Sequence, residues 1–135
     1  MEQNRKATEE ILAAANRHDI PATADFLADG FVYENMTMPG QQGKEGFDGT
    51  HAALFGAFPD LHYRTVNMVV AGNTCLTECI VTGTHQGQFF DIPATGKSIN
   101  LPIAFVTTHD NRGLIKNWKS YYDAASLLRQ MGAIR

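Results

Sequence analysis

Apolar side chains recur at helical spacing in the first part of the chain and at every second position after Leu61. Spacings of three and four residues are typical of helices with one buried face, and a period of two is typical of half-buried strands. In the first part we expect a helix at 5–17, a second from near Pro21 to Gly30, a short strand at 31–35, a loop at 38–43 and a third helix at 44–58. The residues of the third helix that should face inward are Phe47, Leu54, Phe55 and Phe58.

After Leu61 the pattern predicts four long strands at 62–70, 74–85, 98–110 and 114–123. Gly-containing turns at 71–73 and 110–113 are suited to hairpins, and 87–97 is an irregular connection. Helices followed by strands, without alternating βα units, favour the α+β class with a bent, mostly antiparallel sheet. Helices over the concave face of such a sheet leave a cavity, and we expect one domain over 1–135.

The stretch from Gly113 to Gly132 combines a strand with a short amphipathic helix, and Asp123 stands where the two meet. One interpretation is catalytic: a carboxylate near two tyrosines and a tryptophan can acquire the raised pKa that acid/base chemistry needs. The other is structural, because Asp directly before a helix caps its first turn. Spacing alone leaves both open.

The composition excludes several classes of partner. Of the 135 residues 44% are hydrophobic, the net charge is −3, and Lys and Arg are scattered. This argues against nucleic acid or a membrane as the partner. The polar N-terminus and the two cysteines predict a cytoplasmic protein with reduced thiols. If Cys75 and Cys79 share a strand, their Cα atoms lie about 13 Å apart, too far for a disulfide.

Motifs that would indicate a metal or a cofactor are missing from the sequence. The segment 93–98 resembles the end of a phosphate-binding loop, but Asp91 replaces the required glycine and a strand follows. The five histidines lack ligand spacing, and there is no nucleophile elbow. We therefore expect neither metal nor cofactor, which leaves acid/base chemistry or plain binding.

Four segments resemble the SnoaL-like polyketide cyclases of the nuclear transport factor 2-like superfamily. They are 57–61 (AFPDL), 82–87 (TGTHQG), 93–97 (PATGK) and 127–132 (LLRQMG). The resemblance implies a cone-shaped α+β fold whose helices pack on a strongly bent sheet around a pocket. It also implies cofactor-free ring closure of the aldol type, or isomerisation, of a small apolar or aromatic substrate.

Two further segments, 33–36 (YENM) and 118–123 (WKSYYD), resemble limonene-epoxide hydrolase. In that family the matching Tyr, Asn and Asp hold and activate a water. Its Arg-x-Asp pair is replaced here by Cys79 and Val81. Many SnoaL-like sequences also carry an acid at the position of Ser120, so either Ser120 or Asp123 occupies the key acid position.

The candidate substrate-binding residues lie around this carboxylate. Tyr33 and Asn35 are two apart on a strand and face the same side, as pocket groups or as a buried polar pair. Tyr121 shares the parity of Asp123 and is either a hydrogen-bond donor or a core residue. Trp118 has the opposite parity and suits packing or a dimer interface. His85 is either a second acid/base group or a solvated loop residue.

These observations leave three functions open. The first is a cyclase or isomerase in which Asp123 moves the proton, the second is an epoxide hydrolase, and the third is a ligand-binding or dimerisation module without catalysis. Phe89 and Phe90 could form a lid over the cavity or a second face of the core. An exposed convex sheet face predicts a homodimer.

Overall fold

The computed structural model describes residues 2–35, 40 and 42–134 of the chain, so part of the loop expected at 38–43, and Met36 of the 33–36 segment, lie outside the described residues. The elements, in chain order, are α1 (Glu2–Asn16), α2 (Ile20–Thr23), the 3-10 helix η1 (Ala24–Phe26), β1 (Leu27–Asn35), α3 (Lys44–Ala57), β2 (His62–Ala71), β3 (Thr74–Thr84), β4 (Ser98–His109), β5 (Ile115–Tyr122) and α4 (Ala124–Gln130). This is the α+β architecture predicted from the order of helices and strands.

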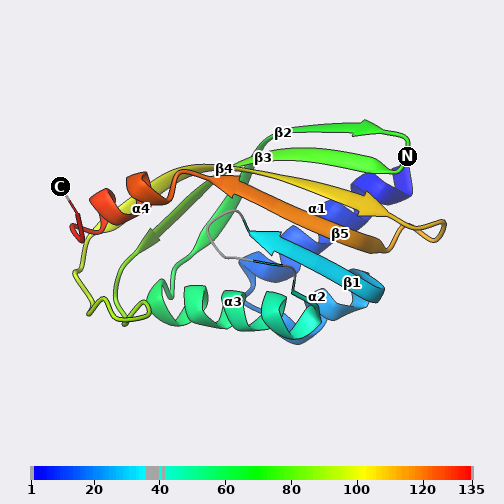
Figure 1. The fold of residues 1–135 in the computed structure, drawn as a ribbon. Helices are drawn as coiled ribbons and strands as arrows, with labels where there is room; N and C mark the ends of the chain where they lie inside the picture. Colours follow the sequence, from blue (N-terminus) through cyan, green and yellow to red (C-terminus); the bar gives the residue numbers. More distant parts are fainter. Residues whose placement is uncertain (1, 36–39, 41, 135) are drawn as a thin grey trace.

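The five strands form one curved sheet in the order β1-β5-β4-β3-β2 (Figure 1). All neighbours are antiparallel except β1, which runs parallel to β5 at the edge of the sheet. The two hairpins expected from the sequence are present. Each turn contains a glycine with positive φ, Gly72 at 58° and Gly113 at 84°, a conformation that glycine adopts without steric cost.

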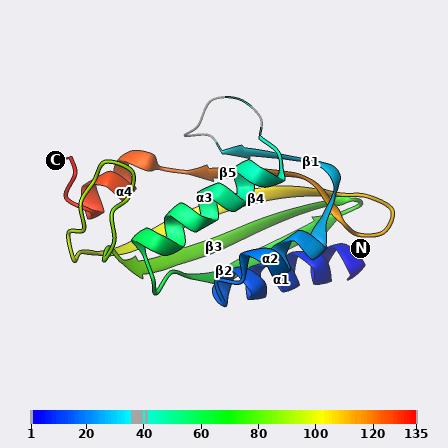
Figure 2. The ribbon, with the colours of Figure 1, turned by 90° about the horizontal axis from the view of Figure 1, so that it is seen from below.

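Helices α1, α2 and α3 lie over one face of the sheet, and the short α4 follows β5 and lies near the start of β4 (Figure 2). The face they cover is apolar at alternate strand positions. On β3 the buried side chains include Cys75, Thr77, Cys79 and Val81. Both cysteines are free and buried. The core divides into one cluster around Phe47 and Trp118 and another around Phe58 and Met131.

The second helix differs from the prediction. Its helical residues end at Phe26, and β1 begins at Leu27, four positions before the strand expected at Phe31. Leu27 pairs with Ile115 of β5, and the register then shifts before Val32, with Gly30 between them at a φ of 77°. Gly30 therefore lies in a bulge within a strand instead of ending a helix. Pairing with a distant strand overrides the local helical spacing here.

Within the described residues, no helix is both long and apolar enough to cross a lipid bilayer. In the same part of the chain, no group of three or more His, Cys, Asp or Glu side chains is arranged to hold a metal ion.

Candidate active site

A cavity of about 370 Å³ opens between α3, the inner face of the sheet and α4. It lies where the two core clusters meet and takes lining residues from both. The described residues that line it are Tyr33, Asn35, Thr50, His51, Leu54, Phe58, Leu61, Tyr63, Val81, Phe89, Phe90, Ile99, Leu101, Ile103, Phe105, Trp118, Ser120, Tyr122, Ala124, Leu127 and Leu128. Most are apolar, and the polar ones are few, which is typical of a small-molecule site.

Four of the polar lining residues come from neighbouring positions on β1 and β5. The parallel register places Tyr33 beside Trp118 and Asn35 beside Ser120. Asn35 Nδ2 donates a hydrogen bond to the Tyr33 hydroxyl at 3.2 Å, and Trp118 Nε1 donates to Ser120 Oγ at 2.9 Å. Tyr33 and Ser120 also hydrogen-bond to each other, which uses one of their two hydroxyl protons and leaves the other to be donated. These residues therefore form a corner of the cavity that can bind an oxygen atom. We call Tyr33, Asn35, Trp118 and Ser120 the polar corner.

The Tyr33 phenol lies deep in this corner and is almost fully enclosed. Burial raises its pKa, because a phenolate would lose its hydration. Hydrogen bonds to the side chains of Asn35, Ser120 and Thr50 act in the opposite direction and reduce the shift. Tyr33 therefore remains a neutral hydroxyl at neutral pH.

His51 faces the cavity from α3 and is 7% exposed. Its Nδ1 lies 2.8 Å from the carbonyl oxygen of Phe47, one helical turn earlier. The Phe47 ring is 4.3 Å from the His51 ring and 5.2 Å from the Tyr33 ring, measured between centroids, so it packs against both. Burial lowers the pKa of His51, while the Phe47 carbonyl and Asp48 raise it by smaller amounts.

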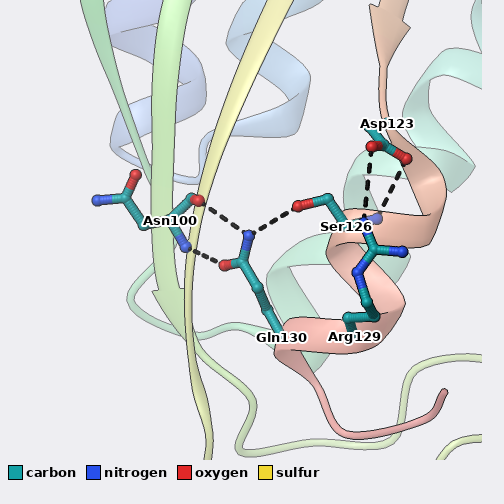
Figure 3. A network of polar contacts seen from close by, with 5 residues as sticks. All are labelled: Asn100, Asp123, Ser126, Arg129 and Gln130. Carbon is teal, nitrogen blue, oxygen red and sulfur yellow. Dashed lines mark hydrogen bonds and ion pairs between the residues drawn. The ribbon is translucent and has the colours of Figure 1, made fainter. Parts of the chain in front are cut away.

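Asp123 does not belong to the cavity lining. It is the N-cap of α4: its Oδ1 accepts a hydrogen bond from the Ser126 backbone N–H at 3.2 Å (Figure 3). Its Oδ2 is 3.9 Å from Nη2 of Arg129, and 65% of its side-chain surface is exposed. The geometry matches the capping interpretation of the sequence, with the carboxylate directed to the solvent side.

Tyr121 and Trp118 are placed by the alternation of β5. Trp118, Ser120 and Tyr122 line the cavity, whereas Tyr121 points to the opposite face of the sheet and is 43% exposed. Tyr121, which shares the parity of Asp123, was expected from the sequence to reach the substrate, but this side of β5 faces outward. Trp118 is both a core residue, stacked on Phe105 at 4.4 Å, and a lining residue.

His85 is fully buried and is absent from the cavity lining. Its Nδ1 accepts a hydrogen bond from the Thr95 backbone N–H at 3.3 Å and lies 2.9 Å from the Thr95 hydroxyl. The ring thus ties the end of β3 to the connection that leads to β4, and it is not a solvated loop residue. Within that connection, Phe89 and Phe90 line the cavity, and Phe90 is 66% exposed.

The lining residue His51 was not among the sequence candidates for the site, and Ser120 was considered only as the alternative to Asp123 for the key acid position. The signal for Ser120 is its parity with Trp118, together with the acid that many SnoaL-like sequences carry at this position. The signal for His51 is helical spacing, because it lies four residues after Phe47 and three before Leu54 on the apolar face of α3. A polar residue on a face that is otherwise apolar marks a buried polar group.

A family model described as SnoaL-like polyketide cyclase matches residues 5–131. The fold is similar to that of AclR from Streptomyces galilaeus, a proposed hydroxylase, with a TM-score of 0.90, 19% identity and coverage of 100% of this chain and 99% of that one. A proposed SnoaL-like polyketide cyclase from a Jannaschia species has a TM-score of 0.88 and 20% identity, over 99% and 94%. IdmH from Streptomyces antibioticus, a proposed polyketide cyclase, has a TM-score of 0.84 and 21% identity, over 96% and 99%.

These identities are low, so the structural similarities establish the fold. A further neighbour, from Catenulispora acidiphila, is described as having a ketosteroid isomerase-like fold, with a TM-score of 0.80 and 19% identity over 95% of this chain and 93% of that one. No curated protein is similar enough in sequence to match the chain.

Proposed function

This chain belongs to the SnoaL-like polyketide cyclase family, and on that premise we propose that it is an enzyme that activates a carbonyl compound by acid/base catalysis. The reaction is the removal of a proton next to a carbonyl group, followed by ring closure of the aldol type or by isomerisation. The substrate is small and apolar or aromatic, because the described cavity lining is mostly apolar. The polypeptide supplies the catalytic groups itself.

The observation that carries this proposal is the polar corner at one side of an apolar cavity. A substrate carbonyl placed there would accept a hydrogen bond from the Tyr33 hydroxyl, which is itself bonded to Ser120 on the neighbouring strand. When a proton leaves the adjacent carbon, negative charge develops on that oxygen. A donor already held in place by β1 and β5 stabilises this charge more than it stabilises the neutral carbonyl, which lowers the barrier.

We propose that Asp123 acts by capping α4, and not by moving the proton. Its hydrogen bond to Ser126 and its exposure support this role. Through the cap, Asp123 contributes to the position of Leu127 and Leu128, which α4 contributes to the cavity lining.

Epoxide hydrolysis has less support than carbonyl chemistry. The described lining contains no carboxylate that could activate a water. Cys79 is buried in the core beside Thr65, and Val81 is an apolar lining residue, so neither replaces the Arg-x-Asp pair. A binding module without catalysis remains the alternative outcome of the experiment below.

The experiment is to incubate the protein with a panel of aromatic methyl esters that bear a β-keto chain and to follow cyclised products by mass spectrometry. We expect product with the wild type and a loss of about 100-fold in turnover with Tyr33→Phe, similar to the loss of one oxyanion donor. Tyr121→Phe is the matched control, because it removes the same hydroxyl from the outer face. Tight binding of the esters without any product would favour the binding module.

We further propose a homodimer formed through the outer face of the sheet. Val69 and Leu76 are paired across β2 and β3, and both they and Tyr121 of β5 are exposed on that face. Light scattering of the wild type and of Leu76→Glu tests this proposal: we expect a dimer that the charge dissociates. A monomeric wild type would contradict it.

A further inference from the structure

The tautomer of His51 is determined by its hydrogen bond within α3. A backbone carbonyl can only accept, so the contact of 2.8 Å with the Phe47 oxygen requires the proton to be on Nδ1. Nε2 then carries a lone pair. The described part of the chain offers no hydrogen-bond donor to Nε2, and this atom is not among the enclosed polar atoms without a partner. Because His51 lines the cavity, its lone pair is available to a bound molecule.

The rest of the described lining contains no competing base. Its only other titratable side chains are Tyr33 on β1, Tyr63 on β2 and Tyr122 on β5. Burial raises the pKa of Tyr33 and of Tyr63, so both stay protonated at neutral pH. A carboxylate is absent from these residues. His51 is therefore the group of this lining whose ordinary pKa lies near neutrality.

Burial keeps the imidazole of His51 neutral at neutral pH. Burial lowers its pKa because the imidazolium would be poorly hydrated, and this is the largest effect. Asp48, one turn earlier on α3, opposes it weakly. From the strands, the titratable groups that share its cavity are Tyr33, Tyr63 and Tyr122.

We propose that His51 is the catalytic base of this cavity and accepts the substrate proton on Nε2. The inference rests on the proposed function, which it deepens by naming the base. It assigns the proton transfer to α3 and the binding of the oxygen to β1 and β5.

The step balances as a proton transfer. The C–H bond next to the carbonyl breaks, and its proton forms a bond to Nε2 of His51. The electron pair becomes the C=C bond of an enolate, whose negative oxygen is held by the polar corner. The enolate carbon then attacks a second carbonyl carbon of the same substrate, and the imidazolium returns the proton to the alkoxide that forms. In an isomerisation, the proton returns to another carbon instead.

The test measures deuterium uptake from heavy water into 2-tetralone, a planar ketone with acidic hydrogens next to its carbonyl. The variant is His51→Asn, whose amide can still donate to the Phe47 carbonyl. We expect the exchange rate to fall at least about 100-fold, as for loss of a general base. The affinity for 2-naphthol, which resembles the enol of 2-tetralone, should stay within about threefold, because the polar corner is intact.

His109→Asn is the matched control. His109 is also buried, and its Nδ1 also bonds to a backbone carbonyl, that of Gly113 at 2.9 Å, but it does not line the cavity. This variant should exchange 2-tetralone at the wild-type rate. Equal losses in both variants would show a general structural effect and overturn the inference.

The outcomes separate the two proposals. If the wild type exchanges 2-tetralone and His51→Asn does so equally fast, the base is another group, and the proposed function stands. If the wild type exchanges none, and cyclises none of the β-keto esters, the proposed function fails and His51 loses its role with it. Should His51→Asn fail to fold, ¹⁵N NMR of the wild-type imidazoles decides. A proton on Nε2 instead of Nδ1, or an Nε2 signal unaffected by 2-naphthol, would overturn the inference.

Discussion

Gln130 of α4 hydrogen-bonds to both backbone polar groups of Asn100 on β4 (Figure 3). Its side chain thus supplies the two hydrogen bonds that a neighbouring strand would make. Its Oε1 accepts from the Asn100 N–H at 2.6 Å, and its Nε2 donates to the Asn100 carbonyl at 3.0 Å. The pairing of β5 with β4 starts at Ile103, so β5 does not reach Asn100. The contact fixes α4 on β4 beside the cavity that Leu127 and Leu128 line.

Replacing Gln130 should therefore loosen α4. We expect Gln130→Ala to lower the free energy of unfolding by about 1 kcal/mol, because net contributions of hydrogen bonds are about this large. Arg129→Ala is the control: the ion pair of Arg129 with Asp123 is exposed and 3.9 Å long, and such pairs contribute little. Urea denaturation of the two variants provides the measurement. Equal losses of free energy in the two variants would mean that the contact with Asn100 contributes no more than the exposed ion pair.

Changes at Asp123 separate its capping role from a catalytic one. Asn is as good an N-cap as Asp, so Asp123→Asn should be nearly neutral, whereas Asp123→Ala should cost about 1 kcal/mol of stability. Neither should change the rate of 2-tetralone exchange by more than about threefold, because the side chain is outside the cavity lining. A loss near 100-fold in Asp123→Asn would restore the carboxylate as the acid/base group.

The sequence predicted the fold well where local signals decide. Turn glycines fixed the two hairpins, and the spacing of Phe47 and Phe58 located α3 within one residue of its observed end. Strand β1 was placed less well, because its start depends on pairing with Ile115 near the other end of the chain. Such a pairing leaves no periodic signal in 24–30 itself.

The site was harder to predict because alternation shows that a strand has two faces, but not which one is buried. Both parities of β5 contain aromatic residues, Tyr121 on one and Trp118 and Tyr122 on the other. The neighbours decide: Trp118 packs on Phe105 and lies beside Tyr33, which directs Ser120 inward and Tyr121 outward. Tyr33 and Asn35 were correctly expected to face one side together, as their hydrogen bond requires.

Introducing a carboxylate at Ser120 should make the stability depend on pH. Ser120 is 4% exposed, and burial would raise the pKa of Ser120→Asp above its unfolded value of about 3.9. The folded state would then bind more protons than the unfolded state. The variant should therefore be less stable than the wild type by roughly 1–3 kcal/mol at pH 7.5 and recover as the pH falls towards 5.

Ser120→Asn is the matched control for this prediction, because the amide has the same size and no charge. The difference in free energy of unfolding between Ser120→Asn and the wild type should be the same at pH 7.5 and at pH 5.0. Urea denaturation at pH 7.5 and 5.0 compares the three proteins. A deficit of Ser120→Asp that does not shrink at pH 5.0 would mean that the carboxylate reaches solvent and that position 120 is not enclosed.

The buried histidines should destabilise the wild-type protein in mild acid. Burial lowers the pKa of His51 and of His109 below the ordinary value of 6.5. Between 6.5 and the lowered values, the unfolded chain therefore binds protons that the folded chain does not. The free energy of unfolding is thus highest above pH 6.5 and falls as the pH drops through this window. Urea midpoints at pH 7.5, 6.5 and 5.5 should decrease in that order.

The lowered pKa of His51 should also set the pH dependence of catalysis. Exchange of 2-tetralone requires the neutral imidazole of His51, so the rate should stay level to below pH 6.5 and decline only as the lowered pKa is reached. The His109→Asn variant should keep this rate profile but lose part of the pH dependence of stability, because His109 affects only folding. A rate that already falls above pH 6.5 would show that His51 is not held neutral by burial, and a profile displaced by His109→Asn would show that the two effects are not separable.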